Sequence, residues 1–155
     1  MSGEDQAEGV VIVRGAATAF AQEITAGRHR LVSDEPASAG GTDTGPTPYD
    51  LLLAALGSCT SLTIAMYAKR KGWPVDGVTV RLRHARTHAQ DCQDCEARPA
   101  ALTVITRDIE LEGPLDEAQR ARLLEIANRC PVHRTLTSTI DIQTQLVPIA
   151  GGART

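Results

Sequence analysis

Two cysteines set in apolar surroundings are the residues of this sequence best suited to chemistry. Cys59 lies within the apolar run from Thr47 to Lys71, and Cys130 follows an amphipathic stretch much later in the chain. A thiolate can attack a peroxide oxygen and become a sulfenic acid, which a second thiol converts to a disulfide. Such chemistry needs a nearby cation or helix terminus that favours the thiolate. Plain core packing is the alternative, because free cysteines often fill apolar interiors.

A second group of candidate ligands lies in the sequence HARTHAQDCQDC. The spacing H-x3-H-x3-C-x2-C suits a tetrahedral zinc site made by His84, His88, Cys92 and Cys95. The alternative is a polar hairpin tip that its acidic residues keep in water. Those acids also disfavour a reactive thiol at Cys92 or Cys95. One such cluster without a second does not match the usual zinc patterns, so no metal ligand is assigned firmly.

A third candidate is His133, three residues after Cys130. An imidazolium at that position could lower the pKa of the Cys130 thiol. A histidine that is simply packed or exposed is the alternative.

The segment that must position Cys59 is predicted to be a long helix. Thr47 can cap its first turn, Pro48 suits the first helical position, and Asp50 can complete a capping box. Residues 51–68 are apolar almost all the way round, which is typical of a helix buried in a core or at a subunit interface. Its small polar residues make it a poor membrane span. Gly57 suggests close packing by another helix.

The remaining patterns predict a mainly antiparallel sheet that covers this helix. Residues 33–48 read as a loop rich in Gly, Pro, Asp and Thr, and Asp116 to Arg129 as an amphipathic helix with Cys130 on its apolar face. The predicted strands are Val10–Phe20 paired with Gln22–Val32 through a turn near Gly27, Val78–Leu82, Leu102–Leu111 with a bulge between Val104 and Ile105, and Ile140–Leu146. Helices separated by hairpins indicate an α+β fold.

Length and charge indicate how many domains, which partners and which cellular compartment to expect. The 155 residues suit one domain, and we expect a disordered start over residues 1–9, a single domain over 10–148 and a short tail over 149–155. The net charge is −3 without a basic stripe, so neither nucleic acid nor a membrane is an expected partner. The acidic start lacks an apolar signal core, which predicts a cytoplasmic protein. In the cytoplasm, cysteines serve redox chemistry, metal binding or packing rather than structural disulfides.

Two sequence segments resemble a known family. GGTDTGPTPYDLLLAALGSCTS, followed much later by NRCPVHRTL, is similar to the OsmC/Ohr family of thiol peroxidases, from about Gly40 to Val147. HRTL and DCxxC look most like the broader OsmC-like branch rather than Ohr proper. The resemblance implies an intertwined homodimer whose two central helices are wrapped by mainly antiparallel sheets.

The same resemblance implies a function. The chain would be a cysteine-based reductase of organic hydroperoxides in oxidative stress defence, with Cys59 as the peroxidatic and Cys130 as the resolving cysteine. A dithiol reductant would restore the enzyme. No cofactor is expected, because the redox centre is the dithiol itself, although zinc at the hairpin tip is an alternative.

The residues that would activate Cys59 are less clearly marked. Well-studied members of the family use an Arg and a Glu, and the position of the Glu, ten residues before the cysteine, is Tyr49 here. Asp50 is the nearest acid, but on a straight helix it would lie on the far side from Cys59, which suits capping better. The candidate arginines come from the N-terminal hairpin and are Arg28 and Arg30, with Arg14 as a third option.

Loss of the family's Glu supports an alternative function. The chain would then be a binding protein that holds an apolar ligand in the buried interface pocket without turnover. A structural zinc module on the hairpin tip is a further alternative.

Overall fold

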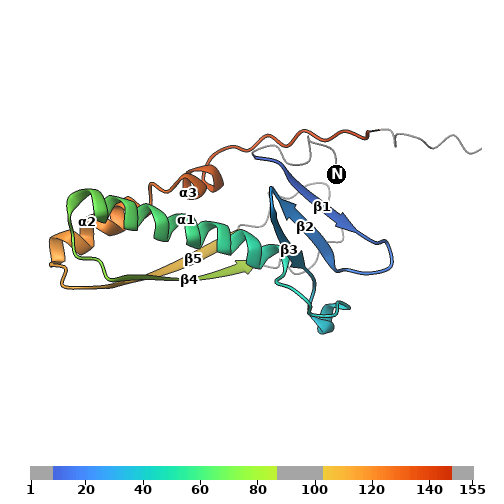
Figure 1. Ribbon diagram of the computed structural model, residues 1–155, viewed down its shortest axis with the longest axis horizontal. Helices are drawn as coiled ribbons and strands as arrows, with labels where there is room; N and C mark the ends of the chain where they lie inside the picture. The colour runs from blue at the N-terminus through green and yellow to red at the C-terminus, as the bar shows by residue number, and fades with distance from the viewer. Residues whose placement is uncertain (1–8, 87–102, 148–155) are drawn as a thin grey trace, which may run out of the picture.

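Helix α1 (Pro48–Lys71) is the element against which one strand and two helices later in the chain pack in the computed structural model, which describes residues 9–86 and 103–147 (Figure 1). The other elements, in chain order, are β1 (Val11–Gly15), β2 (Gln22–Ala26), β3 (His29–Ser33), the short 3-10 helix η2 (Ala37–Ala39), β4 (Gly77–Arg86), β5 (Thr103–Glu112), α2 (Glu117–Ala127) and α3 (Pro131–Leu136). One antiparallel sheet has the order β1-β2-β3 and the other is the β4-β5 hairpin. The fold is therefore α+β, as the sequence predicted.

The bounds of α1 are those that its capping residues predicted. The Thr47 hydroxyl accepts a hydrogen bond from the Asp50 N–H at 3.2 Å, and the Asp50 carboxylate accepts one from the Thr47 N–H at 3.0 Å. The hydroxyl of Thr47 is the main cause of the lowered pKa of Asp50. At the other end Gly72 takes a left-handed conformation and its N–H returns to the Ala68 carbonyl, which closes the last turn.

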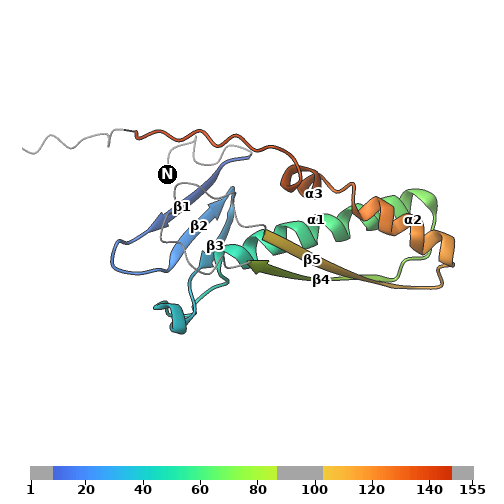
Figure 2. The ribbon, with the colours of Figure 1, turned by 180° about the vertical axis from the view of Figure 1, so that it is seen from behind.

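One face of α1 forms the core and the opposite face is exposed. The hairpin β4-β5 lies along one side of the helix, α2 lies beside one end, and α3 lies across its middle (Figures 1 and 2). The buried core consists of Ile64 and Ala68 from α1, Leu123 and Ala127 from α2, and Leu115 before α2. On the other face, Leu62 and Met66 keep 63% and 72% of their surface exposed.

By length and composition, α1 is the one helix in the described part of the chain that could span a membrane. The core helices of globular proteins pass the same test. Helix α1 packs against β4, α2 and α3, as the core helix of a globular protein does.

Gly57 is indeed a point of close approach, but the neighbour is a strand rather than the predicted helix. A Cβ atom at Gly57 would lie 2.8 Å from Cδ1 of Leu82 in β4. The missing side chain therefore lets the β4-β5 hairpin lie close to α1.

Two strand predictions need correction. The turn at Gly27 joins β2 to β3, so the segment Gln22–Val32 folds into two strands, and the N-terminal sheet has three strands rather than two. The bulge predicted between Val104 and Ile105 is absent, because the register of β4 with β5 is continuous from Gly77↔Glu112 to Arg86↔Thr103. The apolar pattern shifts there because Val104 points outward, with 43% of its surface exposed.

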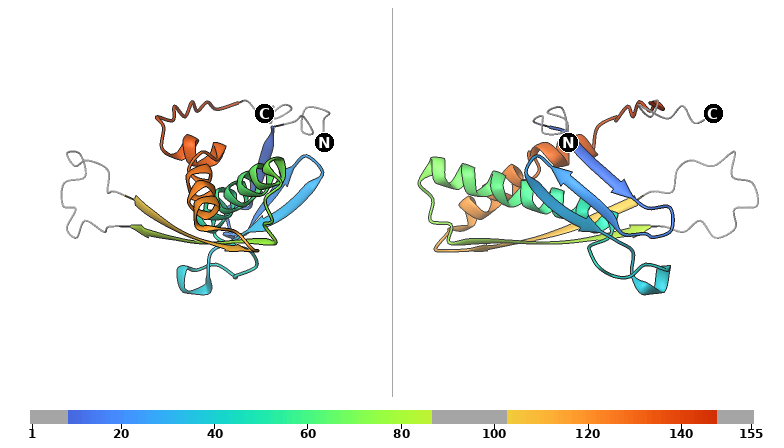
Figure 3. Two further views of the ribbon diagram at one scale, coloured as in Figure 1. Left: turned by 90° about the vertical axis from the view of Figure 1, so that its left-hand side faces the viewer. Right: turned by 45° about the vertical axis from the view of Figure 1, so that its right-hand side comes forward.

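The end of the described chain differs most from expectation. Ile140–Leu146 was predicted as a strand, yet residues 139–147 form no helix or strand and run away from the body of the protein (Figure 3). Ile142 and Leu146 are 81% and 101% exposed. A strand needs a neighbour to accept its backbone hydrogen bonds, and no strand among the described residues pairs with this segment. Of the expected terminal segments 1–9 and 149–155, residues 1–8 and all of 149–155 lie outside the described residues.

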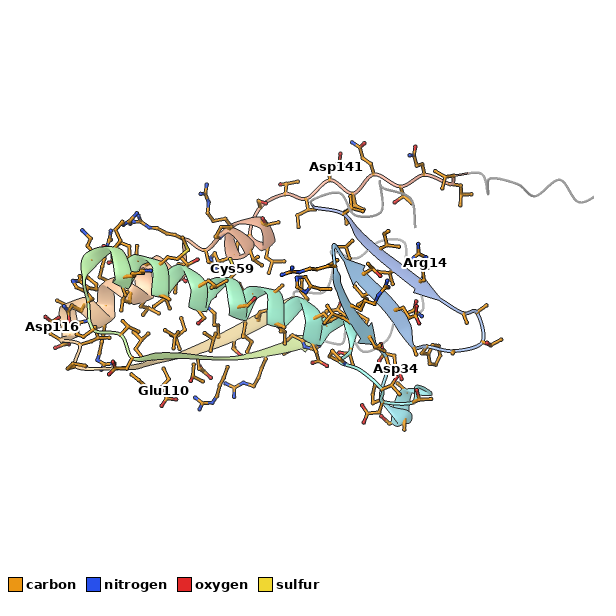
Figure 4. All side chains as sticks on the ribbon, in the orientation of Figure 1. Arg14, Asp34, Cys59, Glu110, Asp116 and Asp141 are labelled. Carbon is orange, nitrogen blue, oxygen red and sulfur yellow. The ribbon has the colours of Figure 1, made fainter. Side chains whose placement is uncertain are left out.

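The loop between β3 and α1 is organised by a buried carboxylate. Asp34 is 1% exposed and accepts hydrogen bonds from the N–H of Glu35 and from both the N–H and the hydroxyl of Thr42 and Thr44, at 2.7 to 3.1 Å. These bonds, that of the Thr42 hydroxyl first, hold the pKa of Asp34 far below its usual range. The carboxylate thus fixes the loop that leads into α1 (Figure 4).

We expect Asp34→Asn to loosen this loop at neutral pH, because an amide has one acceptor oxygen where the carboxylate has two. Since the folded pKa is depressed, the contribution of Asp34 to stability is complete above about pH 4 and is lost as the pH falls further. Limited proteolysis within residues 35–46 should be faster for Asp34→Asn than for wild type at pH 7. Equal cleavage rates at pH 7, with the exposed Asp43→Asn as the matched control, would contradict the assignment.

Candidate active site

Cys59 lies on α1 at the boundary between its packed and its exposed faces. Figure 4 shows it on the part of the helix that α3 crosses. The side chain is half-buried, and its sulfur accepts a hydrogen bond from the Val132 N–H of α3 at 3.5 Å. Its carbonyl oxygen also accepts one from the Thr63 hydroxyl at 2.7 Å. The sulfur therefore combines partial access from solvent with a backbone donor.

Cys130 does not lie on the apolar face of α2, as the sequence predicted, but caps α3. Its sulfur accepts a hydrogen bond from the His133 N–H at 3.3 Å, in the place where a serine or threonine oxygen usually caps a helix. Pro131 occupies the first helical position. The cysteine is completely buried. The dipeptide Cys-Pro was the sequence signal for this cap, because proline is common at the first position of a helix.

A threonine and an arginine that the sequence reasoning missed complete the surroundings of Cys130. The Thr60 hydroxyl lies 3.7 Å from the Cys130 sulfur and donates to the Leu56 carbonyl at 2.7 Å. From β5, one Nη of Arg107 donates to that hydroxyl at 2.8 Å, and the other donates to Oδ1 of Asn128 at 2.8 Å. Thr60 is completely buried, so the guanidinium reaches into the core from the edge of the protein.

The position of Arg107 follows from the register of the hairpin. It lies opposite Leu82, whose side chain packs at Gly57, one turn before Thr60 on α1. Its neighbours at alternate positions of β5, Ile105 and Ile109, face the same side. An arginine among apolar inward-facing positions is the sequence signal that could have marked this residue.

These contacts change the acidity of Cys130. Burial raises the pKa of its thiol, but the hydrogen bonds with the His133 N–H, Thr60 and Cys59, together with the charge of Arg107, outweigh burial, and the net pKa is lowered. Cys59 is therefore one of the groups that lower the pKa of Cys130. Although 71 positions of sequence separate them, the fold places the two thiols near enough for Cys59 to affect the pKa of Cys130.

A cavity of about 410 Å³ opens beside this group, between β5 and the helices. Its polar lining includes Arg107, Asn128 and His133, and its apolar lining is Leu56, Ile105, Ile109, Leu124 and Leu136. His133 thus lines the cavity, and its contact with Cys130 is made by its backbone N–H. The cavity could receive an apolar molecule close to the buried thiol.

The candidate activating residues lie elsewhere. Arg14, Arg28 and Arg30 belong to the N-terminal sheet and its turn, where Arg30 donates to the Thr25 hydroxyl at 3.1 Å and Arg28 is exposed. Figure 4 shows Arg14 on β1, well apart from Cys59. Asp50 is engaged in the cap of α1. The contacts to the two thiols come instead from Thr60, Val132 and His133, and through Thr60 from Arg107.

The zinc candidates are almost entirely outside the described part of the chain. His88, Cys92 and Cys95 lie outside the described residues. His84 is on β4, where its ring stacks on Tyr49 with centroids 4.8 Å apart. Within residues 9–86 and 103–147, no group of three or more His, Cys, Asp or Glu side chains could hold a metal ion.

The sequence of this chain matches a protein family, and its fold is similar to those of known proteins. The family model for OsmC-like proteins matches residues 41–145, whereas no curated protein sequence matches. An OsmC-like protein from Mycoplasma pneumoniae is 18% identical with a TM-score of 0.67, covering 82% of this chain and 85% of its own. The organic hydroperoxide resistance protein OsmC from Legionella pneumophila is 16% identical, with a TM-score of 0.62 and coverages of 85% and 90%. The organic hydroperoxide resistance protein OhrB of Bacillus subtilis is 20% identical, with a TM-score of 0.58 and coverages of 85% and 92%.

Proposed function

Because the chain belongs to the OsmC-like protein family, we propose that it is a cytoplasmic cysteine-based peroxidase that reduces organic hydroperoxides in oxidative stress defence. The observation that carries this proposal is the contact between the half-buried Cys59 and the buried Cys130. The names of the proteins from Legionella pneumophila and Bacillus subtilis, which refer to organic hydroperoxide resistance, support it.

In the first step, Cys59 is the nucleophile because, of the two described cysteines, it is the one that solvent can reach. Its thiolate attacks the outer oxygen of the hydroperoxide, and an S–O bond forms as the O–O bond breaks. The alcohol leaves after its oxygen takes up a proton, and Cys59 becomes a sulfenic acid. The Val132 N–H, which already donates to this sulfur, helps to hold the negative charge before the attack.

In the second step, Cys130 attacks the sulfur of the sulfenic acid. The S–S bond forms as the S–O bond breaks, and the hydroxide that leaves takes up a proton and becomes water. The lowered pKa of Cys130 supports this role, because the thiolate is the nucleophilic form. A dithiol reductant then returns both cysteines to thiols. The redox centre is the dithiol alone, so the proposal requires no cofactor.

Thiol counting tests the proposal. One equivalent of cumene hydroperoxide should remove two of the four thiols of each chain at once, because the sulfenic acid closes to a disulfide. Alkyl hydroperoxides should react faster than hydrogen peroxide, since burial of each CH₂ group contributes about 0.8 kcal/mol. If both thiols survive an excess of cumene hydroperoxide, the peroxidase proposal fails.

A homodimer is the second part of the proposal. The exposed face of α1 carries Leu62 and Met66, and the segment after α3 carries the fully exposed Leu146. Large apolar side chains exposed in this way are typical of a surface that another protein covers. A second copy could cover the helix face and supply the neighbour that the predicted strand Ile140–Leu146 needs. Such an interface would bury more than the roughly 1,600 Å² of a standard complex.

We expect light scattering to give twice the chain mass at micromolar concentration. Leu62→Asp should convert the dimer to monomer or aggregate, because it puts a charge into the proposed interface. Lys69→Asp, on the exposed part of the last turns of α1, is the comparison for the added charge. A wild-type protein that scatters as a monomer would overturn this part of the proposal.

One observation favours the alternative of a binding protein. Tyr49 occupies the position of the family's activating Glu, and it stacks on His84. The largely apolar cavity beside Cys130 could then hold a ligand without turnover. Under this alternative, cumene hydroperoxide would remove thiols slowly or not at all, while an apolar ligand would raise the midpoint of thermal unfolding.

A further inference from the structure

Arg107 reaches the pair of cysteines through one intermediate residue. The guanidinium donates to the Thr60 hydroxyl at 2.8 Å, and that hydroxyl lies 3.7 Å from the Cys130 sulfur. Thr60 and Cys130 are both completely buried. Water therefore cannot replace their hydrogen bonds, and each of these bonds affects the balance between the thiol and the thiolate of Cys130.

The hydroxyl of Thr60 has a single proton and two possible acceptors. It is now donated to the Leu56 carbonyl at 2.7 Å, so a protonated Cys130 donates its own S–H to the Thr60 oxygen. When Cys130 loses its proton to solvent, the Thr60 hydroxyl can turn and donate to the sulfur instead. In both states Arg107 continues to donate to the Thr60 oxygen, which makes the hydroxyl a stronger donor.

We propose that Arg107 is a positioning residue which, through the hydroxyl of Thr60, prepares Cys130 as the thiolate that closes the Cys59–Cys130 disulfide. This inference rests on the proposed peroxidase function. The second donor group of Arg107 is held by Oδ1 of Asn128 at 2.8 Å, so the planar fork is fixed at both ends. A lysine could not make both contacts at once.

The other groups near Cys130 are a thiol, a backbone N–H and a neighbouring arginine. Among the described residues, Cys59 contacts it from α1, the His133 N–H contacts it from α3, and Arg129 precedes it after the end of α2. His133 contributes a backbone group, which no side-chain replacement removes. Arg107 is the cation whose charge acts on this sulfur. The effect of replacing Arg107 should therefore be separable from that of other nearby positive charges.

The first test needs no peroxide. In a chain with Cys59, Cys92 and Cys95 replaced by serine, the ultraviolet absorbance of the thiolate follows the titration of Cys130 alone. Arg107→Met and Thr60→Val should each raise its midpoint by about one pH unit. Arg107→Lys should raise it less. Arg134→Met, which removes an exposed cation from α3 that makes no contact with Thr60, is the matched control and should leave the midpoint in place.

The second test uses the chain that retains Cys59 and Cys130. After one equivalent of cumene hydroperoxide, Arg107→Met should slow disulfide closure by up to about tenfold, the factor that one pH unit represents wherever the pH lies below the midpoint. Formation of the sulfenic acid, followed with a dimedone-type trap, should keep its rate. Asn128→Ala should give an intermediate slowing, and it provides a milder variant if Thr60→Val does not fold.

The outcomes distinguish failure of this inference from failure of the proposed function. If peroxide is consumed but neither the titration nor the closure rate responds to Arg107→Met, the inference is wrong and the proposed function stands. If no peroxide is consumed, the titration alone decides whether Arg107 acts on Cys130. Equal shifts for Arg134→Met and Arg107→Met would replace the specific role by a general effect of charge and overturn the inference.

Discussion

Replacing Cys59 by serine is expected to reduce hydroperoxide consumption to the level of the protein-free solution. Cys59 is the half-buried thiol on α1, while its neighbour Cys130 is completely buried. An alcohol at this position ionises far less readily than a thiol and cannot form a sulfenic acid, so the first step has no nucleophile. Loss of cumene hydroperoxide over time, followed in the presence of excess dithiol, measures the effect.

The matched control for this variant is Ser58→Ala. Ser58 is exposed on the neighbouring position of α1, and its hydroxyl donates only to the Ala55 carbonyl at 3.2 Å. This variant should keep full activity, which would show that a change at this point of the helix is tolerated. Full hydroperoxide consumption by Cys59→Ser would remove Cys59 from the mechanism and leave the binding protein as the better hypothesis.

Helix α1 shows how much of this fold could be predicted from local sequence. Its start depends on residues within four positions of one another, and the capping box of Thr47 and Asp50 forms as predicted. Its end depends on Gly72, again a local signal. A helix whose ends are determined by neighbouring residues can therefore be predicted from a single sequence.

The surroundings of Cys130 could not be predicted in the same way. Arg107 and Thr60 are 47 positions apart, and they meet only because the β4-β5 hairpin lies against α1 where Gly57 leaves room. No local pattern states which residue of a strand will oppose which turn of a helix. The sequence suggested Arg28 and Arg30 of the N-terminal hairpin as the cation beside Cys59, whereas the cation that acts on Cys130 is Arg107 of β5.

The segment Ile140–Leu146 shows a different limit. Its alternation of apolar and polar residues is the pattern of a strand with one buried face, yet in the described chain its side chains are exposed. An alternating pattern indicates that the apolar face of a strand is covered, but it does not indicate which molecule covers it. The mismatch between pattern and exposure therefore supports a second copy of the chain as the missing neighbour.

Replacing Cys130 by serine should leave the first step intact and block the second. Serine is a favoured N-cap residue, so its hydroxyl can accept the hydrogen bond from the His133 N–H and α3 should keep its start. Cys59 would then react once and remain a sulfenic acid. With excess cumene hydroperoxide it should be oxidised further to the sulfinic acid, because no thiol is present to condense with the first product.

Intact mass spectrometry distinguishes these states, since each added oxygen increases the mass of the chain while a disulfide decreases it. The measurement is best made with Cys92 and Cys95 also replaced by serine, so that neither can act in place of Cys130. Wild-type Cys130 in the same background should give the disulfide instead, and faster as the pH rises through its lowered pKa, because the thiolate fraction grows. A Cys130→Ser chain that turns over repeatedly at the wild-type rate without added oxygen would show that the reductant reduces Cys59 directly. The buried thiol would then serve only to cap α3, and its contacts with Thr60 and Arg107 would have no part in the reaction.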